Sequence, residues 1–303
     1  MARYQRSRVA VGVRRGGGGG GGGGHGRLML RRNATLATGE TLSEIPTSSS
    51  PAPRWSSSSP VSSSAGVVVP EHVCVVPDGS RRWSLANGGN AEMGYSHGAE
   101  ALHRTVRGCR AAGVRALTVY AFSTDNWYRP APEVAVLMRV MRESARRKTD
   151  ELRDAGVCVR FVGNLSKLPA ALRTQLAATE HATRNNTDMY LTVCLSYSGR
   201  QDILNACREL AASVASGELA AEDISEEDIN SRLCTSYLTE RGITSHPDVL
   251  IRTSGEQRTS NMMVWEAAYT ELVFSRTPWP EFDEDDLHDA FREFGSRKRR
   301  FGR

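Results

Sequence analysis

The sequence predicts an α/β fold, a single domain in which helices flank a central, mostly parallel sheet of six strands. Two patterns in residues 67–303 support this prediction. Short runs rich in β-branched residues alternate with segments whose apolar residues recur every three or four positions. Such an alternation is typical of a parallel sheet, because each connection between parallel strands crosses one face of the sheet. No internal repeat is visible, so we expect one domain rather than an array of units.

The first part of the predicted domain starts with a strand at residues 73–76. We expect a helix next, capped by Ser96 and closed by Gly113, because its apolar residues fall on one face. A strand at residues 116–122 follows. The next helix runs from about Pro132, a residue type that suits the first turn because the N–H it lacks has no helical partner there.

The second part of the predicted domain continues the alternation, and the same criteria of period and length assign each element. In order, we expect a strand at residues 157–162, a helix through residues 168–176, a strand at residues 190–195, a helix through residues 203–214, strands at residues 248–252 and 270–274, and a helix that begins at Asp283. A basic stretch follows this last helix.

The first 66 residues have a composition that cannot build a core. They contain nine consecutive glycines at 16–24 and a serine-rich stretch with three prolines at 48–64. A segment with so little apolar surface cannot offset its chain entropy, so we expect residues 1–66 to form a disordered tail and residues 67–303 to form the domain. The tail is rich in arginine and serine and has no acidic residue before Glu40, which is typical of an organelle transit peptide. A plain disordered extension is the alternative.

The net charge of +5 belongs to the tail and not to the domain. Residues 1–65 contain nine arginines and two glutamates, a balance of +7, whereas the remaining residues balance at −2. A folded nucleic-acid-binding domain should carry positive charge on its own surface, so we expect no nucleic-acid partner. No apolar run reaches the length of a membrane span, so we expect no transmembrane segment.

Six cysteines are scattered along the chain, and no two of them have the close spacing of a zinc site. Five of them fall in predicted strands or on apolar helical faces, which favours buried, reduced thiols. These five are Cys74, Cys109, Cys158, Cys194 and Cys207.

Polar segments follow four of the predicted strands. These segments span residues 77–83, 123–129, 196–200 and 252–261, and they are rich in arginines, hydroxyls and carboxylates. In open α/β sheets, ligands bind beyond the carboxyl ends of the strands. Arginines that converge with hydroxyl residues bind phosphate through charge-assisted hydrogen bonds, and an acid such as Asp78 among them favours a divalent ion. Each segment alone could be a turn or a solvated loop, but together they predict a diphosphate site.

Other phosphate and acyl chemistries lack their motifs. No Walker sequence is present, and the glycine run precedes the domain, so nucleotide binding is not indicated. No Gly-x-Ser-x-Gly elbow is present, so a triad hydrolase is not indicated either.

Several motifs resemble those of the cis-prenyltransferase family, the undecaprenyl diphosphate synthase-like proteins. The resemblance extends from His72 to the C-terminus, and a plant plastid-type member is the nearest kind. The matching segments are His72–Gly79 (HVCVVPDG), Tyr120–Trp127 (YAFSTDNW), Arg252–Glu256 (RTSGE) with Ser260-Asn261, and Ala268–Leu272 (AYTEL). Their order and spacing also match.

The resemblance implies that the protein condenses isopentenyl diphosphate with an allylic diphosphate to give a (Z)-polyprenyl diphosphate. It implies Mg²⁺ as the cofactor, with Asp78 and Glu271 near the metal, and a catalytic role for Asp78 together with Ser123 and Asn126, which match positions that act in proton removal. The substrate-binding residues that it implies are Gly79, Arg82, Trp83, Phe122, Trp127, Arg129, Arg252, Arg258, Ser260, Arg300 and Gly302. Phe122 and Trp127 would pack beside the isoprenoid.

The sequence departs from the family pattern in the loop that grips the allylic diphosphate. Ser80 stands where the family usually has asparagine, Tyr95 where it has histidine, and Ala91 where it has an arginine. Losing a charged phosphate contact costs about 1.5–3 kcal/mol. We therefore expect weakened or altered allylic substrate use, or reduced activity. A catalytically weak or inactive accessory subunit of a heteromeric enzyme is the alternative, although Asp78 is present.

The resemblance also implies a dimer, homomeric or with a related subunit, because Arg300-Phe301-Gly302 resembles the family's terminal Arg-x-Gly motif. A lipid product makes peripheral membrane contact an expectation. Serine dominates the tail and the family has many plastid members, so the plastid stroma is preferred to the mitochondrion. The small Ala121, at a position that lines the product tunnel in relatives, favours a medium chain length, and short products remain an alternative.

Overall fold

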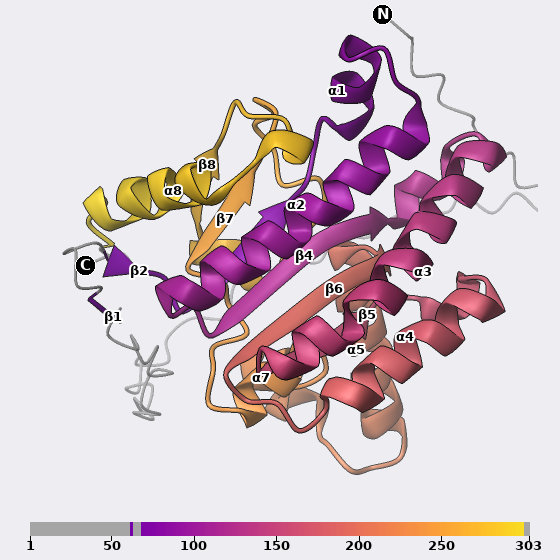
Figure 1. Ribbon diagram of the computed structural model, residues 1–303. Coiled ribbons are helices and arrows are strands. Elements are labelled where there is room, and N and C mark those ends of the chain that lie inside the picture. The colour runs from indigo at the N-terminus through magenta and orange to yellow at the C-terminus, as the bar shows by residue number, and fades with distance from the viewer. Residues whose placement is uncertain (1–60, 63–67, 300–303) are drawn as a thin grey trace, which may run out of the picture. The chain divides into compact units, whose positions relative to one another are not determined.

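A sheet of six parallel strands runs through the centre of the fold (Figure 1). The computed structural model describes residues 61–62 and 68–299, which belong to one compact unit. The strand order is β5-β6-β4-β3-β7-β8, and every neighbouring pair is parallel, which confirms the predicted fold class. The strands are β3 (His72–Val76), β4 (Ala116–Ser123), β5 (Val157–Val162), β6 (Met189–Tyr197), β7 (Val249–Arg252) and β8 (Glu271–Phe274).

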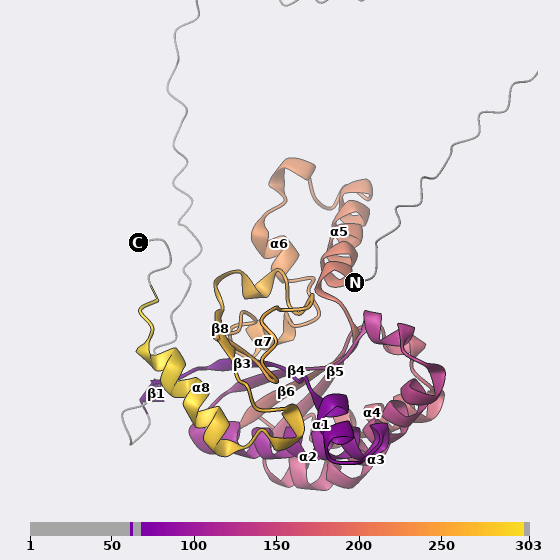
Figure 2. The same ribbon diagram turned by 90° about the horizontal axis from the view of Figure 1, so that it is seen from above.

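Helices cover both faces of the sheet, with α2, α3, α4 and α8 on one face and α5, α6 and α7 on the other (Figure 2). The helices are α1 (Ser80–Ala86), α2 (Ala91–Ala112), α3 (Ala131–Asp154), α4 (Ala170–Thr183), α5 (Gly199–Ala215), α6 (Glu226–Asn230), α7 (Tyr237–Glu240) and α8 (Glu284–Ser296). Short 3₁₀ helices are η1 (Thr124–Tyr128), η2 (Leu165–Lys167), η3 (Ala221–Asp223), η4 (Glu266–Tyr269) and η5 (Trp279–Glu281).

The strand β3 shows why both faces need helices. Its alternate side chains Val73 and Val75 belong to the core beneath α2, α3 and α8, whereas Cys74 and Val76 belong to the core on the opposite face. Successive strand residues point to opposite faces, so a strand that is apolar throughout must be covered on both sides. All five residues of β3 are buried, including Cys74, whose burial the sequence predicted.

The start of the second helix differs from the sequence prediction. Asn90, not Ser96, caps α2, because its Oδ1 accepts a hydrogen bond from the backbone N–H of Met93. Ser96 is an interior residue of α2. The predicted end is confirmed, since Gly113 adopts φ 90°, a left-handed conformation that favours glycine. The short helix α1 between residues 80 and 86 was not predicted, because seven residues carry too little periodicity.

β1 (Val61–Ser62) pairs antiparallel with β2 (Val68–Val69), so this short ladder reaches upstream of residue 67, while the predicted domain boundary stays a prediction. One further expectation needs correction. Cys207 is exposed, although the other four cysteines predicted to be buried are buried. Cys207 lies on α5, where Ala206 and Leu210 face the core instead.

The carboxyl ends of β4, β3 and β7 lie side by side, because these strands are neighbours in the sheet. The polar segments at residues 77–83, 123–129 and 252–261 therefore meet at one edge, as the sequence predicted. β6 adjoins β4 and places residues 196–200 at the same edge. Among the described residues, no helix is long and apolar enough to cross a membrane.

Candidate active site

Asp78 lies just beyond the carboxyl end of β3 and is fixed there by its backbone. Its N–H donates to Thr253 Oγ1 at 2.8 Å, and its carbonyl oxygen accepts from the backbone N–H of Trp279 at 2.9 Å. Thr253 directly follows β7, the neighbouring strand. Gly79 has φ 91°, and a Cβ there would lie 2.4 Å from Ser254 Oγ, so only glycine lets the two loops approach. The backbone thus positions Asp78 between two loops.

Arg252 forms an ion pair with Asp78 from a buried position. Its Nη2 lies 2.8 Å from Asp78 Oδ2, and its side chain is 5% exposed. Its Nη1 donates at 2.6 Å to Ser260 Oγ and at 2.6 Å to the carbonyl oxygen of Arg258. Its Nε is buried and has no partner among the described residues. Because buried N–H groups are nearly always hydrogen-bonded, this orphan donor is consistent with an anionic ligand beside Arg252.

Two exposed arginines share the carboxylate of Glu256. Arg82 Nη1 lies 3.0 Å from Glu256 Oε1, and Arg258 Nη1 lies 2.5 Å from Glu256 Oε2. Arg82 also donates to Ser254 Oγ at 3.0 Å and lies 3.4 Å from Asp78 Oδ1. The hydrogen bond from Arg258 lowers the pKa of Glu256 below its usual value. Three arginines thus surround two acids, which leaves positive charge for an anion.

The loop after β7 holds an unusual number of residues with positive φ. Ser254, Ser260, Asn261 and Met263 all have φ between 43° and 68°. Such conformations cost of order 1–3 kcal/mol each and persist only where surrounding contacts enforce them. Asn261 supplies such contacts, since its Oδ1 accepts from the N–H of Arg200 at 2.9 Å and its Nδ2 donates to Ser198 Oγ at 2.7 Å. Arg252 in turn donates to Ser260 Oγ and to the carbonyl oxygen of Arg258, two residues of the same loop.

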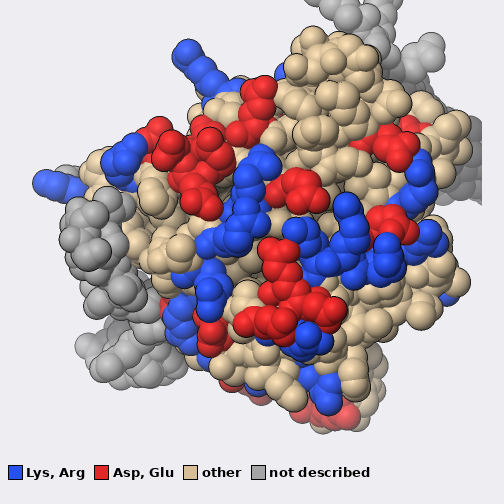
Figure 3. Space-filling model, in the orientation of Figure 1, with Lys and Arg blue, Asp and Glu red and all other residues tan. Residues whose placement is uncertain are grey.

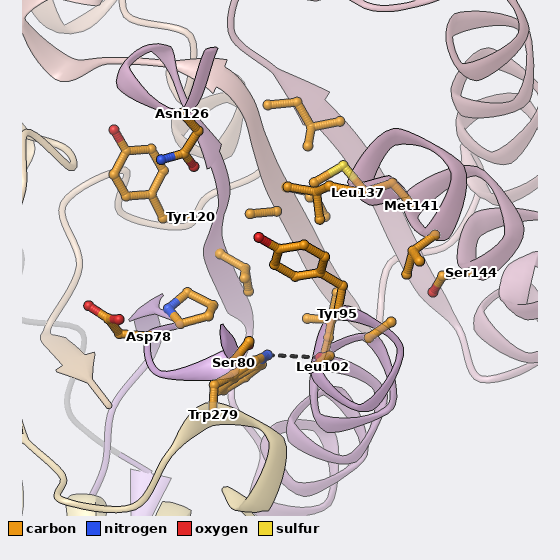
Figure 4. A pocket seen from close by; sticks show the side chains of 18 of the residues that line it. Asp78, Ser80, Tyr95, Leu102, Tyr120, Asn126, Leu137, Met141, Ser144 and Trp279 are labelled. Atoms are coloured by element: carbon orange, nitrogen blue, oxygen red, sulfur yellow. Dashed lines mark hydrogen bonds between the residues drawn. The ribbon is translucent and has the colours of Figure 1, made fainter. Parts of the chain in front are cut away.

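A cavity of about 520 Å³ opens at this cluster and continues between α2, α3 and the sheet (Figure 4). Its opening is polar and includes Asp78, Arg82 and Arg258. Its interior is largely apolar, as Leu137, Met141 and other aliphatic side chains show. An apolar cavity with a few convergent charged groups at its mouth is the usual form of a ligand site.

Tyr95 joins three charged residues at the same opening. Its hydroxyl donates to Glu133 Oε1 at 2.5 Å and accepts from Arg129 Nη1 at 3.1 Å. Glu133 also pairs with Arg129 at 3.6 Å and with Arg81 at 3.4 Å. Burial, and then the hydrogen bond to Glu133, raise the pKa of Tyr95 to about 12, so the hydroxyl stays protonated and neutral. Sequence reasoning missed Glu133, although its spacing of four residues from Arg129 on a predicted helix was a usable signal.

The structure brings together most residues expected in the site. Those that line the cavity are Asp78, Gly79, Arg82, Asn126, Arg129 and Arg258. Arg252 and Ser260 contact Asp78 or its partner directly. Ser123 does not line the cavity, but its hydroxyl accepts from the N–H of Asn126, and Asn126 Oδ1 accepts from the N–H of Ser123. Arg300 and Gly302 lie outside the described residues.

Three expected contact residues lie elsewhere. Phe122 is fully buried in the core and packs edge-to-face on Trp127, and neither of them lines the cavity. Trp127 instead donates to Ser196 Oγ at 3.0 Å. Trp83 donates to Glu281, packs on His97 and does not line the cavity. The structure therefore does not bring Phe122 and Trp127, expected beside the isoprenoid, or Trp83, expected to bind substrate, to the wall of this cavity, and these roles stay predictions.

Glu271 is separated from Asp78 within the chain, so the described residues do not bring these two acids together, and the place of Glu271 near the metal stays a prediction. Glu271 begins β8 and pairs with Val249, whereas the cluster lies beyond Arg252 at the other end of the strands. Three residues of strand span about 10 Å, and two strand spacings add a similar lateral distance. The carboxylate of Glu271 pairs with Arg297 at 2.8 Å. In a parallel sheet, a residue that begins a strand and a residue that follows the end of one lie at opposite edges. The sequence already placed Glu271 near the start of a predicted strand and Asp78 after the end of another.

The donor set fits a divalent ion that the ligand helps to hold. Among the residues that the structure describes, no group of three or more His, Cys, Asp or Glu could hold a metal. Mg²⁺ commonly takes only one or two protein carboxylates and completes its shell with water and substrate phosphates. Asp78 is partly exposed and lies beside arginines suited to phosphate, so it meets that requirement.

Comparisons with known proteins agree with this site. Residues 76–302 match the family model described as "Putative undecaprenyl diphosphate synthase". The chain is a member of the cis-prenyltransferase family. A Xanthomonas axonopodis pv. citri relative is 42% identical over 234 residues, which cover 77% of this chain and 89% of the relative. It is named ditrans,polycis-undecaprenyl-diphosphate synthase ((2E,6E)-farnesyl-diphosphate specific).

Plant proteins are also similar to this cis-prenyltransferase. Dehydrodolichyl diphosphate synthase 2 of Arabidopsis thaliana is 40% identical over 238 residues, which cover 78% of this chain and 74% of that protein. The crystal structure of lavandulyl diphosphate synthase from Lavandula x intermedia, in complex with dimethylallyl diphosphate, has a TM-score of 0.73 and 33% identity. It covers 78% of this chain and 99% of that one. The chain is therefore an enzyme that transfers prenyl groups.

Proposed function

We propose that this cis-prenyltransferase condenses isopentenyl diphosphate with an allylic diphosphate into a (Z)-polyprenyl diphosphate in an Mg²⁺-dependent reaction. The single observation that carries the proposal is the continuity of the cavity. A cationic cluster around Asp78 opens directly into a largely apolar space of about 520 Å³. This arrangement suits an amphiphile with a diphosphate head and a hydrocarbon tail.

Arginines at the opening hold the two diphosphate groups in this proposal. Arg252 and Ser260 have donors close to Asp78, and the orphan Nε of Arg252 is available to a phosphate oxygen. Arg82 and Arg258 both pair with Glu256. When these arginines bind phosphate, they release the Glu256 carboxylate. The free carboxylate is not a buried charge, because all three side chains are partly exposed. Forked guanidinium groups match phosphate geometry, which favours arginine in these roles.

The reaction breaks the allylic C–O bond, and the diphosphate leaves with the electron pair. The double bond of isopentenyl diphosphate supplies the electrons of the new C–C bond, and the departing diphosphate takes up the proton whose loss forms the product double bond. Asp78 would hold Mg²⁺, which when bound neutralises charge on the leaving diphosphate. Arginines around Asp78 stabilise the same charge. Asn126 lies at the cavity wall and is placed to help remove the proton, while Ser123 positions it through their reciprocal hydrogen bonds.

A product assay tests this function directly. The purified protein is incubated with Mg²⁺, labelled isopentenyl diphosphate and, separately, allylic diphosphates of ten, fifteen and twenty carbons, and the products are sized. We expect chain formation with at least one starter, and its loss when a chelator removes the metal. A folded protein that gives no product with any starter would contradict the proposal and favour an accessory subunit.

Assembly and location extend the proposal. The Arg300-Phe301-Gly302 motif supports a dimer, homomeric or with a related subunit, which sedimentation of the purified protein would test. The arginine- and serine-rich composition of residues 1–66 and the similarity to plant relatives support import into the plastid stroma. Import of labelled precursor into isolated chloroplasts and mitochondria would distinguish the two organelles.

A further inference from the structure

A hydrogen bond joins α2 to α3 inside the otherwise apolar part of the cavity. His103 Nε2 and Ser144 Oγ lie 3.0 Å apart, and both residues line the cavity. His103 is 5% exposed. Burial lowers the pKa of His103 to about 4, so the imidazole is neutral near pH 7. A neutral polar pair thus interrupts an aliphatic wall.

The pair lies well below the opening of the cavity. His103 is eight residues beyond Tyr95 on α2, which corresponds to about 12 Å of helix. Ser144 is eleven residues beyond Glu133 on α3, or about 16 Å. Figure 4 shows Ser144 across the pocket from Asp78, past Leu137 and Met141. An isoprenoid tail whose diphosphate lies at Asp78 therefore meets the pair at an intermediate depth.

Lining residues continue beyond the pair, so the cavity does not end there. Leu152 lies two turns further along α3 and still lines the cavity. Leu176 of α4 and Val159 of β5 line the same deep region. Space beyond His103 would accept a longer apolar chain if the chain could pass the pair.

Charged side chains cover the outer side of the contact between α2 and α3. Lys148 lies 3.8 Å from Glu100, and Arg107 lies 3.6 Å from Glu151. Acidic and basic side chains alternate on this face in Figure 3. Exposed ion pairs of this kind add little stability. His103 and Ser144 both line the cavity, so a chain that enters it meets their side chains.

We propose that the His103–Ser144 pair limits how far an isoprenoid chain enters the cavity and thereby sets the length of the product. This inference rests on the proposed prenyl transfer. A hydrocarbon chain that passes the pair must cover its polar atoms without offering them a hydrogen bond, which is unfavourable. An aliphatic side chain in place of His103 would turn that contact into favourable apolar burial.

A binding series tests the inference without turnover. We would measure the affinity of the full chain for prenyl diphosphates of ten to twenty-five carbons, for the wild type, His103→Leu and His103→Met. In the wild type, affinity should stop rising once the chain reaches the pair. In His103→Leu it should continue to rise, with about tenfold tighter binding of the longest ligand, because extra methylene groups become buried.

Thr105→Val is the matched control. Thr105 is buried on the same helix, donates to the carbonyl oxygen of Ala101 at 3.0 Å and does not line the cavity. This variant should keep the wild-type chain-length profile. In the product assay, His103→Leu should lengthen the main product by at least one isoprene unit, whereas Thr105→Val should not.

Different outcomes separate the inference from the proposed function. If folded His103→Leu keeps the wild-type profile in the binding series, the inference is overturned and the proposed function stands. If His103→Leu does not fold, His103→Met decides in the same way, because it also replaces the imidazole with an apolar, adaptable side chain. If folded wild type binds no prenyl diphosphate and makes no product, both proposals are overturned.

Discussion

Asp78 is held between arginines that come from different loops, and its neighbourhood explains what its loss should do. Arg252 contacts one carboxylate oxygen from a buried position, and Arg82 approaches the other from an exposed one. Replacing the acid removes the proposed metal ligand and also takes the ion-pair partner from the Arg252 guanidinium, which keeps only its hydrogen bonds to Ser260 and to the carbonyl oxygen of Arg258. Breaking a buried ion pair is costly because the remaining charge stays desolvated.

Asp78→Ala should lower turnover by on the order of 10²–10³-fold while isopentenyl diphosphate binding largely persists. The protein should remain folded, with a lower melting temperature because Arg252 loses its partner. Steady-state kinetics, thermal unfolding and equilibrium binding of labelled isopentenyl diphosphate provide the measurements. Asp78→Asn is the control for size, and it should be similarly inactive. Unchanged turnover in either variant would remove Asp78 from the chemistry.

Tyr95 is a neutral donor where the family usually has a histidine. Its hydroxyl is already used by Glu133 and Arg129, and with a pKa of about 12 it stays neutral. A tyrosine cannot supply the positive charge that a protonated histidine would offer to a diphosphate. Tyr95→His combined with Ala91→Arg should tighten allylic diphosphate binding by about tenfold or more, since each charged hydrogen bond contributes about 1.5–3 kcal/mol. Titration calorimetry with a non-reacting allylic analogue would measure this change.

The matched control at this position is Tyr95→Phe. It removes the hydroxyl but leaves Glu133 paired with Arg129 and Arg81. This variant should not tighten binding. Equal affinity in the double variant and the wild type would show that the altered loop does not limit use of the allylic substrate.

Among the elements, η4 carries a buried acid on the face of the sheet away from the cavity. Glu266 is 2% exposed and accepts a hydrogen bond from Thr235 Oγ1 at 2.8 Å. Burial raises the pKa of Glu266 from 4.5 to about 7. Between pH 4.5 and about 7, the Glu266 carboxyl keeps its proton in the folded protein and loses it in the unfolded chain. Glu266 therefore favours folding fully below pH 4.5 and progressively less as the pH rises to 7.

Glu266→Gln should remove this dependence because the amide does not ionise and still accepts from Thr235. The free energy of unfolding at pH 8 should rise relative to the wild type by up to about 3 kcal/mol, and the two proteins should converge near pH 4.5. Urea unfolding at a series of pH values would check this. A constant difference across the whole range would contradict the assigned pKa.

At the scale of the whole molecule, the described residues include β1 at Val61, upstream of the predicted boundary at residue 67. We propose that residues 1–60 can be removed without loss of the fold, because their glycine- and serine-rich composition offers little apolar surface for a core. The truncated protein should keep the melting temperature and turnover of the full chain within error. A further deletion through Ser62 should lower the melting temperature slightly, because it removes the strand that pairs with β2. A large loss on removing residues 1–60 would show that the tail belongs to the fold.

Particular elements show what the pattern of residues could predict. The apolar runs at β3, β4 and β6 identified strands because runs of four to eight β-branched residues have few other stable uses. Gly113 and Asp283 marked a helix end and a helix start by their backbone and side-chain chemistry. Asp78 and Arg252 were predicted to meet because both follow parallel strands, whose carboxyl ends share one edge.

Other features were decided by tertiary contacts. The register of β4 shifts between Tyr120 and Phe122, and this irregularity decides which side chains face the cavity. Ala121 lines the cavity and Phe122 does not. The regular alternation of side chains along a strand could not by itself show which of the two faces the cavity, because the strand is irregular at this point. Glu133 and Tyr95 come from different helices, so their contact follows from how α2 packs on α3.

The sequence by itself determined the α/β class, the order of the elements and the edge of the sheet where charge gathers, because these depend on local periodicity and on residues that end strands. Only the tertiary structure decided the depth and course of the cavity, the pairing of His103 with Ser144 and the separation of Glu271 from Asp78. These depend on distances between elements far apart in the chain, and packing fixes such distances after the local pattern has formed the elements.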